Sequence, residues 1–112
     1  MPANSENFRW GTELVACFDD LRPHFGVRSP PIVDREVVPH FDGRPDDMFI
    51  WFICERAVDV APAEAQRLEL QAAVQERMTA GGFPKQAVDS LRSGVTSLED
   101  INAGGGRFYY FR

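Results

Sequence analysis

The chain contains two histidines, His24 and His40, and carboxylates lie near both of them. Asp34, Glu36 and Asp42 are candidates for the third ligand of a metal site built from two histidines and one carboxylate. Either imidazole is also suited to acid–base catalysis near neutral pH. A small enzyme, or a ligand- or metal-binding protein, is therefore an alternative function. Both histidines follow prolines in segments that resemble loops or edge strands, and exposed or hydrogen-bonded loop histidines are the favoured prediction.

The C-terminal segment GGGRFYYFR, residues 104–112, combines a glycine run with aromatic residues and arginines. In strands that bind single-stranded nucleic acid, aromatic rings stack on bases and arginines contact phosphates. A glycine run can also present backbone N–H groups to an anion. The net charge of −5 and the pI near 4.9 oppose binding to a polyanion. Nucleic-acid binding through this segment is therefore a second alternative, and an aromatic core strand is the favoured prediction.

Other patterns with chemical meaning are weak. Cys17 and Cys54 are far apart and form no CxxC motif, so two buried, reduced thiols are expected. The acidic loop DGRPDD, residues 42–47, lacks the alternating oxygen ligands and final glutamate of a calcium loop. No nucleophile stands in a recognisable catalytic motif. The sequence therefore argues against an enzyme, and it predicts no catalytic residue, cofactor or bound metal.

Length and composition indicate one folded domain over residues 1–112, with the first few residues loose. The 112 residues are 44% hydrophobic and 26% charged, which is ordinary for a globular protein. The start of the chain has no cationic stretch followed by an apolar run, so we expect no secretory signal. The longest apolar run is too short for a membrane-spanning helix. A cytoplasmic protein without membrane contact is the resulting expectation.

Three segments have the apolar spacing of amphipathic helices. In the first, Leu14, Phe18 and Leu21 share one face, and Pro23 is expected to end the helix. The second is expected to stop at Gly81. The predicted helices are 12–22, 62–79 and 84–93.

Strands are predicted where apolar or aromatic residues alternate between turns. The predicted strands are 35–41, 48–57 and 107–112, with Pro39 placing the first at an edge. Thr96 and Glu99 have the spacing of a capping box, which predicts a brief helical turn over 97–102. The fold class is therefore α+β, with a small antiparallel sheet of about three strands packed against helices.

The run MFIWFIC, residues 48–54, is apolar on both faces of its predicted strand. Because successive side chains point to opposite faces, Phe49 and Trp51 oppose Ile50 and Phe52. Such a strand at a sheet edge would promote aggregation, so we expect it in the centre of the sheet. The helix over 62–79 can cover one face. The N-terminal helix, a second copy of the protein or a ligand remains to cover the other.

The apolar strand favours a binding role over chemistry. A tryptophan or phenylalanine side chain of ~200 Å² left in water forfeits about 5 kcal/mol before entropy is counted. The short N-terminal helix is not expected to cover every aromatic residue of the second face. We therefore predict a non-enzymatic binding or regulatory protein that forms a homodimer or binds a protein partner, with complete intramolecular burial as the rival. The predicted interface residues are Phe49, Trp51, Tyr109 and Phe111.

Overall fold

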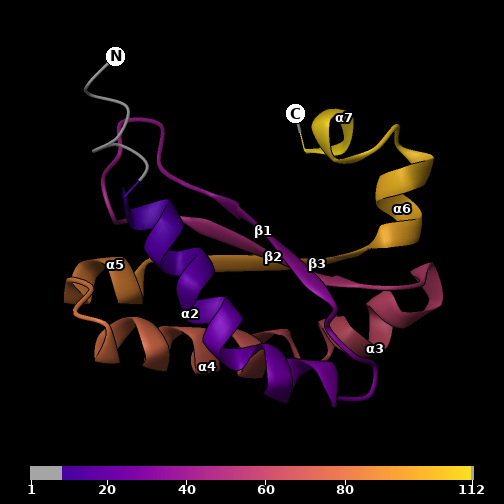
Figure 1. The fold of residues 1–112 in the computed structure, drawn as a ribbon, viewed down its shortest axis with the longest axis horizontal. Coiled ribbons are helices and arrows are strands. Elements are labelled where there is room, and N and C mark those ends of the chain that lie inside the picture. Colours follow the sequence, from indigo (N-terminus) through magenta and orange to yellow (C-terminus); the bar gives the residue numbers. More distant parts are fainter. Residues whose placement is uncertain (1–8, 112) are drawn as a thin grey trace.

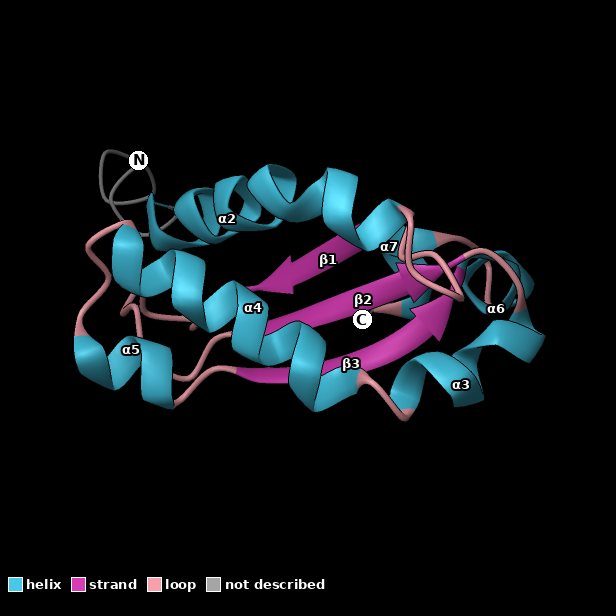
Figure 2. Ribbon diagram, turned by 90° about the horizontal axis from the view of Figure 1, so that it is seen from below, coloured by secondary structure: helices cyan, strands magenta, loops and turns pink. Residues whose placement is uncertain are grey.

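Two helices from separate parts of the chain cover one face of a three-stranded sheet, and a short C-terminal helix lies on the opposite side (Figure 1, Figure 2). The computed structural model describes residues 9–111, so the predicted loose start of the chain lies outside the described residues. The strands are β1 Asp34–Val38, β2 Phe49–Cys54 and β3 Arg92–Ser97. The helices are α2 Arg9–Gly26, the 3-10 helix η1 Ala57–Asp59, α3 Val60–Glu64, α4 Arg67–Ala80, α5 Lys85–Asp89, α6 Leu98–Ala103 and α7 Arg107–Tyr110.

Strand β2 is the central strand of the sheet, as its apolar faces predicted. The strand order is β1-β2-β3. β1 pairs with β2 antiparallel, with Glu36 opposite Trp51. β3 pairs with β2 parallel, with Gly94 opposite the same tryptophan. The α+β class and a sheet of three strands are confirmed.

The predicted antiparallel sheet is wrong in one of its two pairings, because the sheet is mixed. The chain leaves β2, passes through α3, α4 and α5, and enters β3 in the same direction as β2. A crossover through a helical layer produces a parallel pair, whereas a hairpin produces an antiparallel one. The β1–β2 pair is the one in which no helix lies between the two strands along the chain.

The third strand lies in a different segment from the one predicted. The strand predicted over 107–112 is wrong: Arg107–Tyr110 is helix α7, and Arg112 lies outside the described residues. The third strand is instead RSGVTS, residues 92–97. The sequence patterns predict a helix up to residue 93 and a helical turn from residue 97, with no strand between them. The two serines and the glycine of RSGVTS concealed the alternation. Aromatic residues favour strands only when a neighbouring strand pairs with them, and tertiary contacts override that preference here.

The helix boundaries also differ from the predictions. α2 continues through Pro23 to Gly26, because a proline in the exposed last turn removes only one backbone hydrogen bond. The helix predicted over 62–79 starts earlier and is interrupted between α3 and α4 at Ala65 and Gln66. The helix predicted over 84–93 ends at Asp89. The strands predicted over 35–41 and 48–57 end at Val38 and Cys54.

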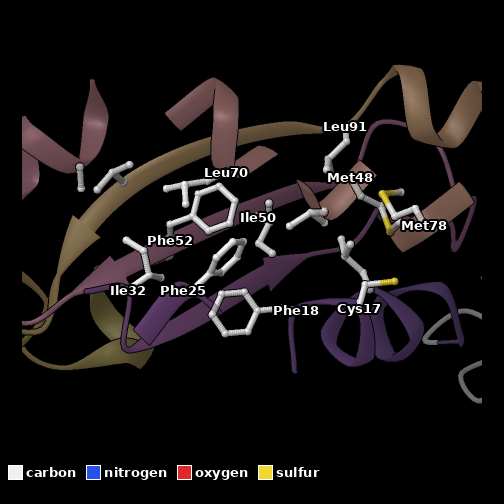
Figure 3. Close-up of a cluster of buried hydrophobic side chains, with 14 of the residues drawn as sticks. Cys17, Phe18, Phe25, Ile32, Met48, Ile50, Phe52, Leu70, Met78 and Leu91 are labelled. Atoms are coloured by element: carbon white, nitrogen blue, oxygen red, sulfur yellow. The ribbon is translucent and has the colours of Figure 1, made fainter. Parts of the chain in front are cut away.

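The core lies between the sheet and the layer formed by α2 and α4. The Phe52 ring centroid lies 5.9 Å from that of Phe25 and 6.5 Å from that of Phe18, both on α2. Leu70 and Val74 of α4 are buried in the same cluster. Figure 3 shows these rings converging beneath β2. Each such side chain contributes about 1.5–3 kcal/mol on burial, so this face of the sheet is stabilised within one molecule.

Candidate interaction surface

The opposite face of the sheet, the outer face, is covered by helix α7 at one end. Alternation along the paired strands places nine residues there: Asp34, Glu36, Val38, Phe49, Trp51, Ile53, Arg92, Gly94 and Thr96. Ile53 and Thr96, near the carboxyl end of β2, are buried. Phe49 and Trp51 are partly exposed, and Val38 at the other end is 43% exposed. Figure 2 shows α2 and α4 in front of the sheet, whereas α7 lies on its far side.

Three rings form a continuous row along the outer face, which we call the aromatic row: Phe49, Trp51 and Phe111. The ring centroids of Phe49 and Trp51 are 5.0 Å apart, and those of Trp51 and Phe111 are 5.7 Å apart. Such separations are typical of favourable tilted aromatic pairs. The row joins two neighbouring positions of β2 to the residue that follows α7.

Gly94 of β3 supports the aromatic row from the adjacent strand. A Cβ atom on Gly94 would lie 2.8 Å from the Trp51 ring and 3.1 Å from the Phe49 ring. Because Gly94 has no side chain, both rings can pack closely against the backbone of the sheet. At the far end of the row, the Arg92 guanidinium lies 5.7 Å from the Phe49 ring centroid, which is within the range of a cation–π interaction.

Helix α7 is attached to the sheet by side-chain hydrogen bonds as well as by Phe111. Gly106 has φ +92°, a left-handed conformation that favours glycine, and the helix begins at the next residue. The Tyr110 hydroxyl is 2.7 Å from the Thr96 hydroxyl on β3. Because Ile53 lies beside Thr96 in the sheet register, α7 covers the end of the outer face where both residues are buried.

Arg107 fastens the start of α7 to β1. Its Nη1 donates to Asp34 at 2.8 Å, and its Nη2 donates to Glu36 at 2.9 Å and to the Arg35 carbonyl at 2.5 Å. Burial of Asp34 opposes its ionisation, but the Arg35 N–H bond and the Arg107 guanidinium outweigh burial and lower the pKa of the carboxyl. These contacts therefore hold the Arg107 guanidinium of α7 at the β1 edge of the sheet.

The structure brings together three of the four predicted interface residues. Phe49, Trp51 and Phe111 form the aromatic row, although Phe111 reaches it from a helical segment and not from a strand. Tyr109 lies apart from the row and is 65% exposed, with its ring centroid 5.3 Å from that of Phe108. The sequence prediction missed Gly94 and Arg92 because it did not recognise β3. Alternation in RSGVTS was the signal that could have identified them.

The two histidines do not share a site. His24 lies in the last turn of α2 and not in a loop. His40 follows Pro39, whose side chain contacts Gly11 near the start of α2. The thirteen helical steps from Gly11 to His24 span ~20 Å. Within residues 9–111, no group of three His, Cys, Asp or Glu residues is arranged to hold a metal ion.

Local partners occupy both ring nitrogens of His40. Nδ1 lies 2.6 Å from the Asp42 carboxylate, and Nε2 lies 2.7 Å from Nη2 of Arg44. With Nδ1–H donating to Asp42, Nε2 accepts from the guanidinium. An imidazole held in this way has no unoccupied nitrogen for a substrate in this structure.

The remaining candidate chemical groups are also used for packing. Cys17 and Cys54 are free and buried, and burial raises the pKa of both thiols. A shallow groove of about 380 Å³ between α2 and β1 is lined by Gly11, Thr12, Val15, Val37 and Pro39. None of the described residues that line it has a titratable side chain.

The chain was compared with models of protein families, with characterised proteins and with solved structures, and no match was found. Among the helices of residues 9–111, none is both long enough and apolar enough to span a bilayer.

Proposed function

We propose that this protein is a small, non-enzymatic binding or regulatory module that associates with a second copy through the outer face of its sheet. The observation that carries the proposal is the aromatic row, whose three rings lie side by side on the outer face and are all partly exposed. Exposed apolar patches above a few hundred Å² usually signify contacts. The free, buried thiols support a reducing compartment such as the cytoplasm as its place of action.

The edge of β1 is a poor alternative for self-association. The Arg35 N–H donates to the Asp34 carboxylate at 2.8 Å, and the Arg35 carbonyl accepts from Arg107. Pro39, just beyond the strand, has no N–H to donate. Side chains that occupy backbone groups, and a proline at the end of a strand, oppose pairing with another strand. This arrangement favours contact through the face of the sheet.

Substitution of Phe49 tests the proposal. The wild-type chain is expected to sediment as a dimer at micromolar concentration, and Phe49→Gln is expected to raise the dissociation constant about tenfold or more, as for a central aromatic contact. Leu68→Gln is the matched control, because Leu68 is a 66% exposed apolar residue on α4. It is expected to leave the dissociation constant unchanged.

Quenching of Trp51 fluorescence provides a second measurement in the same experiment. In a Trp10→Phe background, Trp51 is the sole tryptophan, and its quenching by acrylamide is expected to decrease as the protein concentration increases. A wild-type chain that stays monomeric throughout the micromolar range, with quenching independent of concentration, would contradict the proposal. That result would instead favour complete burial of the aromatic row within one molecule.

A further inference from the structure

Helix α7 presents aromatic side chains both to its own sheet and to solvent. Tyr110 and Phe111 contact Thr96 and Trp51 of the outer face. Tyr109 and Phe108 are 65% and 69% exposed. With ~200 Å² on each ring, these two side chains leave roughly 270 Å² in water on one short helix. An exposed aromatic area of this size on so small a protein requires a structural explanation.

The part of the outer face that no helix of residues 9–111 covers is about one helix wide. Strand β2 has six residues and is therefore ~20 Å long. A helix with its side chains is ~10 Å across, so α7 covers about half of that length. Figure 1 shows α7 above one end of the strands, with α6 next to it. The other half carries Val38, Phe49 and Arg92.

We propose that, in the dimer, the α7 helix of each copy packs on the uncovered end of the other copy's outer face, with Tyr109 against Phe49 and Arg92. The inference rests on the proposed function and specifies how the two copies meet. A two-fold axis makes both contacts at once, because each copy offers one projecting helix and one open half-face. The two α7 helices then lie side by side between the two sheets.

Charge and area both favour the α7 helix of a second copy as the group that packs on this half of the outer face. The Arg92 side chain already lies near the Phe49 ring, and a tyrosine ring placed there gains a second cation–π contact. A stable interface needs about 800 Å² from each partner. The exposed rings of α7 supply about a third of that area, and the aromatic row and Val38 add to it. Arg107 is a positioning residue in this arrangement, since it orients α7 without reaching the partner.

Substitution of Tyr109 separates this inference from the proposed function. Tyr109→Ser is expected to raise the dimer dissociation constant about tenfold in sedimentation equilibrium, as for an interface aromatic residue. Leu68→Ser, at a residue of nearly equal exposure, is the control and is expected to change it less than twofold. If Tyr109→Ser dimerises like the wild type while Phe49→Gln does not, the α7 contact is overturned and self-association stands. If the wild type is monomeric, both are overturned.

Mixing two variants tests whether Tyr109 and Phe49 meet across the dimer. Each homodimer, of Tyr109→Ser or of Phe49→Gln, lacks both Tyr109–Phe49 contacts. In the mixed dimer, the intact Phe49 of the first chain meets the intact Tyr109 of the second, so one complete contact is restored. An equimolar mixture is therefore expected to associate more tightly than either variant alone. A mixed dimer no tighter than the average of the two homodimers overturns the proposed pairing.

Discussion

At the scale of single residues, Gly94 determines how closely Trp51 and Phe49 can approach the sheet. Both rings occupy the space that a side chain at position 94 would need. We predict that Gly94→Ala lowers the free energy of unfolding by about 1–3 kcal/mol, because the added methyl forces the tryptophan off its packed position. Urea denaturation followed by far-ultraviolet circular dichroism measures this change.

Gly26→Ala is the matched control for that substitution. Gly26 ends α2, and a Cβ atom there would contact nothing within 4 Å. Its backbone lies outside the left-handed region, so alanine is expected to be neutral or slightly stabilising. If both variants unfolded at the same urea concentration, the close packing inferred around Trp51 would be wrong.

Asp34 gives a pH dependence whose sign follows from its lowered pKa. The carboxyl ionises more readily in the folded chain than at its ordinary pKa of 3.8, so its ionised form stabilises the folded state. The stabilisation by ionised Asp34 is complete above the ordinary pKa of 3.8. It is lost as the pH falls through the lower pKa of the folded state. We predict that wild type exceeds Asp34→Asn in unfolding free energy by about 0.5–1 kcal/mol at neutral pH.

That difference is expected to shrink towards zero in urea titrations as the pH falls below the ordinary pKa. Asp89→Asn provides the comparison, because Asp89 pairs with the exposed Lys85 on its own helix. Its effect is expected to be small at every pH. A difference for Asp34→Asn that stays constant between neutral and acidic pH would show that the Arg107 contact is not electrostatic.

At the scale of elements, α6 depends on its N-cap, which lies one residue later than the spacing of Thr96 and Glu99 predicted. Ser97 accepts a hydrogen bond from the Asp100 N–H at 3.0 Å and donates to the Asp100 carboxylate at 2.8 Å. Glu99 instead accepts from the Ala57 N–H at 2.8 Å. The predicted turn over 97–102 is thus helix α6, capped by Ser97.

We predict that Ser97→Ala destabilises the protein by about 0.5–2 kcal/mol, the usual effect of removing a helix N-cap. Thermal unfolding of the variant measures it. Thr79→Ala is the control, since the Thr79 hydroxyl bonds back to the Gln75 carbonyl within an exposed helical turn. A Ser97 variant that melts with the wild type would show that the capping bond contributes nothing.

The elements also show where sequence patterns succeed. The segment containing Phe49 and Trp51 was correctly predicted as a central strand. An apolar strand at a sheet edge would promote aggregation, and pairing on both sides prevents this. RSGVTS was missed because its side chains are small, and its strand conformation depends on pairing with β2. The C-terminal segment was misassigned because the anchoring of Arg107 to Asp34 and Glu36 is visible only once the chain has folded.

At the scale of the whole molecule, the two faces of the sheet differ in how they are covered. α2 and α4 bury Phe52 and its neighbours on the inner face. The four-residue helix α7 buries only the Ile53 end of the outer face. This imbalance is the reason for proposing a dimer. It also explains why the candidate site lies on a sheet face instead of in the loops that carry the histidines.

The sequence by itself determined the α+β class and the central position of β2. These properties follow from local periodicity and from the free energy of keeping apolar side chains out of water. Only the tertiary structure decided which segment pairs as β3, that Gly94 lies beneath Trp51, and that α7 lies on the outer face. These features depend on contacts between residues distant in the chain, such as Arg107 and Asp34, which local spacing does not encode.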